Sequence, residues 1–256
     1  MLFAVDSDPA EPKRGVIHVK KAALYLLAIL MVFSCCSCGV DSAASGLGKQ
    51  VLSICDDYKG GKIAADDART KIKNIGLQVY TMEKDKADAE KGNLHRINVA
   101  IGNLYSDMAE PTGKDNEEMQ KIRDKRIERD YTQLKRDLGL VSGRLDGMNN
   151  ATYEKGIQAL EICEKYISGQ INASKAFPQI DKINTEIKNM CAELTAAGAT
   201  RYDSQELDAA TITGEDIMLL RSQLDIYKRS AGASKANIIR YEFYTWYGKL
   251  KNHLGK

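Results

Sequence analysis

Apolar residues recur at alternating spacings of three and four through most of this chain. Such spacing places an apolar stripe along one side of a helix, and it predicts helices over residues 47–58, 64–108, 115–147, 151–168, 172–196, 213–227 and 234–253. Residues 64–108 form either one long helix or two helices broken near Gly92-Asn93, and residues 197–212 form a loop. No segment keeps the period of two that marks a strand. The predicted fold class is therefore all-α, an elongated helical bundle built of antiparallel, coiled-coil-like hairpins.

Some helix ends are also predicted. Gly147 and the pair Asn149-Asn150 mark a turn between two helices. Thr213-Gly214-Glu215-Asp216 has the residues of a helix N-terminus, a hydroxyl cap followed by acidic residues. We therefore expect a helix to begin at residue 213.

An internal duplication appears at an offset of 108 residues. Residues 54–65 align without gaps on residues 162–173, and the identical pairs include Ile54/Ile162, Cys55/Cys163, Tyr58/Tyr166, Gly61/Gly169 and Ile63/Ile171. The match continues as far as Met82/Met190. Each copy predicts a helix–turn–helix hairpin in which the glycine closes the first helix in a left-handed conformation. A binding role for these turns is the alternative, but the repeat needs no function to explain it.

The duplication gives two interpretations of its cysteines. If the hairpins pack about a pseudo-two-fold axis, Cys55 and Cys163 take equivalent inward positions and would meet as a disulfide in an exported protein. Otherwise both are small, buried apolar residues. Cys191 has no mate in the repeat.

Residues 20–33 differ from the rest of the chain. Two lysines precede an apolar run over residues 22–33, which is shorter than the roughly 20 residues of a membrane-spanning helix and suits the core of a signal peptide. The run ends in Val32-Phe33-Ser34-Cys35, with an aliphatic residue three positions before the cysteine and a small residue directly before it. This segment resembles the lipobox of bacterial membrane lipoproteins.

The resemblance implies that Cys35 carries the lipid, in the form of fatty acyl chains such as palmitate, and that the signal peptide is cleaved just before it. The mature chain would then be anchored at the extracytoplasmic face of the cell membrane. Cys36 and Cys38 are alternative lipid carriers with poorer residues three positions upstream. A short buried helix or an uncleaved anchor is the competing interpretation of the apolar run.

Residues 1–18 do not resemble a leader, because they contain acidic residues and prolines (Asp6, Asp8, Glu11, Pro9 and Pro12). A translation start at Val19 on a GTG codon would give the ordinary opening Met-Lys-Lys-Ala, so these residues are a candidate mis-called extension. The expected organisation is a signal peptide over residues 1–34, a lipidated cysteine with a small, polar tether over residues 35–46, and two helical repeat halves over residues 47–148 and 149–256.

Composition and motifs argue against several kinds of function. The 37 basic and 35 acidic residues nearly balance, which gives no support for a nucleic-acid partner. Only three histidines are present, and no metal-type spacing, phosphate-binding loop or nucleophile motif occurs. Acidic pairs such as Asp56-Asp57 are adjacent in sequence and would not face each other on a helix. We therefore expect no catalytic residues, no metal and no cofactor.

Residues 241–247 hold five aromatic residues, including the only tryptophan. The stripe of Ile239, Phe243, Trp246 and Leu250 is expected to dock into the bundle. Beside it lie Tyr241, Tyr244 and Tyr247, which either pack in the bundle as well or form an interface with a protein partner or the membrane.

The sequence thus predicts a lipid-anchored surface protein whose role is protein interaction or structure. An extracytoplasmic small-ligand-binding protein is one alternative, although it needs a cavity that long apolar stripes seldom leave. An immunity or exclusion lipoprotein is another.

Overall fold

The apolar stripes become the inward faces of helices in the computed structural model, which describes residues 41–108, 117–230 and 239–256. Within these residues the helices are α2 (Ser42–Lys59), α3 (Ala65–Met82), α4 (Asp88–Asp107), α5 (Glu117–Asp137), α6 (Asn150–Ile167), α7 (Ala173–Ala196), α8 (Gln205–Ser230) and α9 (Tyr241–His253). The described ranges hold no strand, only an isolated β-bridge between Arg144 and Leu254. The predicted all-α class is confirmed.

The described residues belong to one compact unit, Val40–Lys256. The predicted signal peptide, Cys35 and the tether up to residue 40 lie outside them. None of the helices described is both long and apolar enough to cross a membrane.

Helix α2 begins earlier than expected. Asp41 caps it by accepting hydrogen bonds from the backbone N–H groups of Ala43 and Ala44, at 2.9 and 3.3 Å. Residues 42–46 are therefore helical, and the expectation that they form a tether was wrong. Small residues suit either state, and here Ala44 and Gly48 are buried in the bundle.

The break in residues 64–108 falls at residues 83–87 rather than near Gly92-Asn93. Glu83 is buried there, with its carboxylate 3.3 Å from His95 Nδ1 and accepting a hydrogen bond from Asn98 Nδ2 at 3.3 Å. Gly92, which suggested a breaker, lies inside α4 at a close contact with α9.

Three other ends differ from prediction. Helix α5 stops at Asp137, and the guanidinium of Arg136 donates to the carbonyls of Gly143 and Arg144 in the following loop. Helix α8 begins at Gln205 instead of residue 213, with Ser204 Oγ accepting from the Leu207 N–H at 3.2 Å. Helix α9 begins at Tyr241, and residues 239 and 240 before it are not helical.

The duplication is present in the helix bounds. Shifting α2 by 108 residues gives the bounds of α6, and the same shift carries the start of α3 onto the start of α7. The capping residues Asp41 and Asn149 are also equivalent, and Gly61 and Gly169 both adopt positive φ, at 68° and 75°. The predicted left-handed helix closure is therefore confirmed in both copies.

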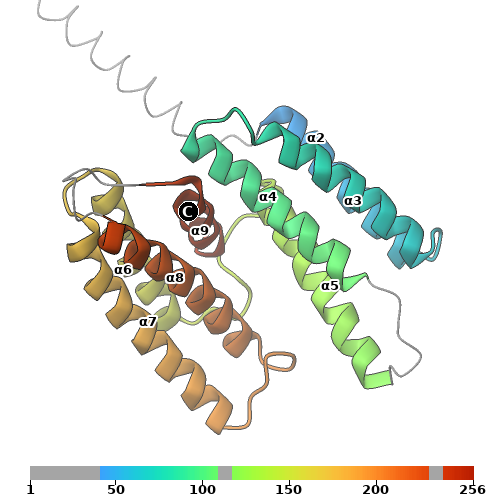
Figure 1. Ribbon diagram of the computed structural model, residues 1–256. Helices are drawn as coiled ribbons and strands as arrows, with labels where there is room; N and C mark the ends of the chain where they lie inside the picture. The colour runs from blue at the N-terminus through green and yellow to red at the C-terminus, as the bar shows by residue number, and fades with distance from the viewer. Residues whose placement is uncertain (1–40, 109–116, 231–238) are drawn as a thin grey trace, which may run out of the picture. The chain divides into compact units, whose positions relative to one another are not determined.

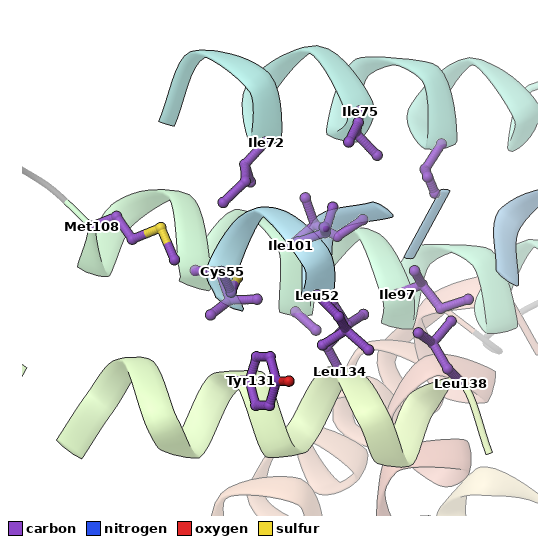
Figure 2. Packing of buried hydrophobic residues seen from close by; sticks show 14 of the residues in the cluster. Leu52, Cys55, Ile72, Ile75, Ile97, Ile101, Met108, Tyr131, Leu134 and Leu138 are labelled. Carbon is purple, nitrogen blue, oxygen red and sulfur yellow. The ribbon is translucent and has the colours of Figure 1, made fainter. Parts of the chain in front are cut away.

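The repeat extends beyond the hairpins to four helices in each half. In the first half (α2–α5) and in the second half (α6–α9) the helices pack in the same order, each on the next and the first also on the third and fourth. Each half encloses its own apolar interior. Figure 2 shows side chains of the first interior, from Leu52 and Ile72 to Ile101 and Leu134, meeting between the four helices.

The halves meet through α9, which packs on α4 and α5 as well as on α6 and α8 (Figure 1). The contact with α4 is close because glycines form it. A Cβ added to Gly92 would lie 2.6 Å from Tyr244 Cβ, and one added to Gly248 would lie 2.1 Å from Arg96 Nη1. The α2–α3 hairpin makes no contact with the α6–α7 hairpin.

Candidate functional site

Buried charged side chains gather where α9 meets the first half. Of those in the described residues, Glu83 lies elsewhere, whereas the junction holds Arg96, Asp130, Arg136, Asp137, Asp216, Lys249 and His253. Burying a charge is costly unless it is paired, so such a concentration marks either a structural network or a binding site. The partners of each group separate the two roles.

Arg96 and Asp137 form a structural pair beneath α9. Arg96 Nε lies 3.0 Å from Asp137 Oδ1, and both side chains are almost fully buried. Asn252 of α9 donates to the same carboxylate oxygen at 3.1 Å. This pair therefore ties α4, α5 and α9 together.

His253, near the end of α9, is held between the halves. Its Nδ1–H donates to Asp216 Oδ2 of α8 at 2.5 Å, and its Nε2 lies against Gln133 Oε1 of α5. The carbonyl of His253 also accepts from the Leu145 N–H at 2.9 Å. Because protein groups engage both ring nitrogens, the imidazole in this arrangement positions helices rather than facing a substrate.

Asp130 is a buried carboxyl in contact with a second one. Burial and a hydrogen bond with the Asp107 carboxyl raise its pKa to about 7, although Arg129, with Nε 3.3 Å from Asp130 Oδ1, acts in the opposite direction. Arg126 Nε lies 3.3 Å from Asp107 Oδ1. Near neutral pH the Asp107–Asp130 pair therefore shares a proton, and one arginine lies beside each carboxyl.

Lys249 differs from all of these groups. It is buried, and its ammonium lies over the ring of Trp246, with Nζ 5.0 Å from the ring centroid. It makes no hydrogen bond or ion pair with any described residue. Arg136 has no carboxylate partner either, but it donates to two backbone carbonyls, whereas the described residues offer Lys249 no hydrogen-bond acceptor.

Some of these groups line a hollow of about 410 Å³ between the halves, which we call the junction hollow. It is open to solvent, and α4, α5, α8 and α9 all contribute to its wall. Its polar groups include Asp130, Gln133, Asp216, Lys249 and His253, and Trp246 with the apolar side chains of Val99, Ile212 and Leu219 completes it. The volume lies in the range of small-molecule sites.

The tyrosines predicted as an interface are engaged within the molecule. Tyr241 makes an edge contact with His95, with ring centroids 5.2 Å apart, and Lys91 Nζ lies 4.4 Å from the centre of the Tyr241 ring. Tyr247 donates to Glu164 Oε1 at 3.1 Å. Tyr244 lies against Gly92. All three are half-buried, which favours the packing interpretation over an exposed interface.

Of the two interpretations of the repeat cysteines, the disulfide is contradicted and the pair of small buried residues is supported. Cys55 and Cys163 are both free and fully buried, and each lies in the interior of its own half. They occupy equivalent places, but the two hairpins do not meet, so the thiols cannot. Burial raises the pKa of Cys55 to about 12 and raises the pKa of Cys163 further, as expected for small buried residues in apolar surroundings.

Sequence reasoning missed Asp130, Asp216, Lys249 and His253. A signal was present, because each is a charged or polar residue within an apolar stripe: Asp130 lies between Ile127 and Leu134, and Lys249 follows Trp246 by three positions. The stripes show that these residues point inward. They do not show which of these residues lie close to one another. The described ranges contain no group of three His, Cys, Asp or Glu side chains placed to hold a metal ion.

Comparisons with protein-family models, curated proteins and solved structures found no match to this chain.

Proposed function

We propose that this chain is a lipid-anchored protein of the bacterial cell surface that binds a ligand close to the membrane. The anchor rests on the lipobox-like residues 32–35. Since α2 begins at Ser42, the chain between Cys35 and Asp41 spans at most ~20 Å at 3.3–3.6 Å per residue. The helical body is then held near the bilayer.

Two ligand classes compete for the binding role. A protein partner at Tyr241, Tyr244 and Tyr247 would need these side chains to be accessible, and all three are half-buried by intramolecular contacts. A small ligand needs a cavity, and the junction hollow supplies one lined by buried polar groups. The observation that carries the proposal is this hollow, so binding of a small ligand is favoured.

The anchor is tested by labelling growing cells with an alkyne analogue of palmitate. We expect label on the wild-type chain and its loss in Cys35→Ala, while Cys36→Ala and Cys38→Ala keep it. Shaving intact cells with protease should remove the labelled protein. An unlabelled chain that stays in the soluble cytoplasmic fraction would refute the anchor without bearing on the hollow.

A further inference from the structure

The unpaired ammonium of Lys249 indicates what the junction hollow accepts. The side chain is 7% exposed, and the wall of the hollow includes its surface. The described residues offer this ammonium neither an anion nor a carbonyl oxygen, so its side toward the hollow can accept one from a ligand. Among the described residues, the ammonium interacts with the electron-rich face of Trp246.

The other charged groups around the hollow have partners within the protein. Arg129 pairs with Asp130, Arg201 donates to Asp208 and Glu215 at 2.9 and 2.7 Å, and His253 pairs with Asp216. Lys249 is therefore the cation of the wall that has no carboxylate or carbonyl partner among the described residues. A singly charged anion suits it, whereas a multiply charged phosphate would meet the carboxylates of Glu215 and Asp216.

Part of the wall is apolar. Trp246, Ile212 and Leu219 face the same space as Lys249. A ligand with an apolar or aromatic body would bury its surface there, while its charged end reaches the ammonium.

We propose that the junction hollow binds a small organic monocarboxylate, with Lys249 bonding the carboxylate and Trp246 packing against the apolar body. The inference rests on the proposed small-ligand function and adds the chemical class of the ligand. The carboxylate accepts charge-assisted hydrogen bonds from Lys249 Nζ, which satisfies the buried ammonium.

Trp246 is the only tryptophan in the chain, so its fluorescence reports on the hollow directly. The full chain, purified from membranes in detergent, is titrated with benzoate, phenylacetate and hexanoate. Benzamide and benzylamine serve as neutral and cationic controls of nearly the same shape as benzoate. We expect a saturable change in Trp246 emission with at least one carboxylate and none with the two controls.

Variants then assign the charge. Lys249→Met keeps the length of the side chain and removes the ammonium, and it should weaken carboxylate binding at least about tenfold, as expected for loss of a charge-assisted hydrogen bond. Lys249→Arg keeps the charge and should retain measurable binding. Lys251→Met is the matched control, because Lys251 lies on the same helix beside Tyr247 rather than in the hollow. The affinity of this variant for the carboxylate should equal that of the wild type. Circular dichroism verifies that each variant is folded.

Two results would overturn the inference. Equal binding of benzamide or benzylamine, or unchanged affinity in folded Lys249→Met, rules out a carboxylate held by Lys249 and leaves a small-ligand function standing. No saturable response to any of the five probes rules out both the carboxylate and the small-ligand function.

Discussion

The interiors of the two halves and the junction between them are built on different principles. Each interior is a stack of apolar stripes, with equivalent residues such as Ile72 and Ile180 fully buried. The junction instead buries charges and brings helices together at glycines. The hydrophobic effect is non-directional and tolerates many packings, whereas buried ion pairs and close glycine contacts allow few. The interiors therefore supply most of the apolar burial, and the junction restricts how the halves are placed and shapes the hollow between them.

The largest effect is expected at the buried pair of the junction. Asp137→Ala leaves the Arg96 guanidinium buried without its carboxylate and should cost about 3–5 kcal/mol of unfolding free energy, measured by urea denaturation. The double variant Arg96→Met, Asp137→Leu should recover most of that loss, because no charge is left buried. If the single and double variants are equally unstable, the pair does not act as a charge pair.

Equivalent changes in the two interiors should have equal effects. Ile72→Ala and Ile180→Ala each remove a fully buried side chain at the same position of the repeat, and each should cost about 2–5 kcal/mol in the same denaturation assay. Leu77→Ala is the control, since its side chain is 55% exposed, and it should change stability by less than about 0.5 kcal/mol. A large cost at one isoleucine and none at the other would show that the halves are not built alike.

The glycine contact between α4 and α9 is tested by adding one methyl group. Gly92→Ala places a Cβ 2.6 Å from Tyr244 Cβ and 2.8 Å from the Tyr241 carbonyl, and this overpacking should cost about 1–3 kcal/mol. Gly102→Ala, on the same helix with nothing within 4 Å of the added atom, should stabilise by roughly 0.5–1 kcal/mol. Melting temperatures that shift the same way in both variants would argue against a close helix crossing.

A pH dependence of stability is expected from Asp130. Its pKa is raised in the folded protein to about 7 from an ordinary value of about 4, so the folded state binds this proton more tightly than the unfolded chain. The stabilisation is complete below pH ~4 and is lost as the pH rises toward ~7. Over that range the wild-type melting temperature should fall relative to that of Asp130→Asn.

Asp203→Asn is the control for this titration. Asp203 is a surface carboxylate whose pKa is lowered by hydrogen bonds from Thr200, so its contribution changes only at more acid pH. Between pH ~4 and ~7 this variant should therefore parallel the wild type. A wild type that parallels Asp130→Asn over the same range would mean that Asp130 titrates normally.

Several features of the fold could be read from local sequence. The 3.6-residue period of a helix depends only on residues close in sequence, so the apolar stripes predicted the helices. The repeat predicted that α2–α3 and α6–α7 form equivalent hairpins. The predicted helix ends were wrong where contacts with residues distant in sequence determine whether a helix continues. Helix α8 continues through Gly214 because its buried face packs on α7, where Gly214 lies against Ile187. Gly92 sits inside a helix because α9 needs the space beside it.

The candidate site could not be read in the same way. Asp130, Asp216 and Lys249 come from three helices and face one hollow only because α9 is placed between the halves. A stripe tells that a side chain points inward, since that follows from the geometry of its own helix. The neighbours of that side chain depend on how segments more than a hundred residues apart pack together. In the junction this packing includes the hydrogen bond from Thr245 Oγ1 to the Gly92 carbonyl, and no local sequence pattern encodes such a contact.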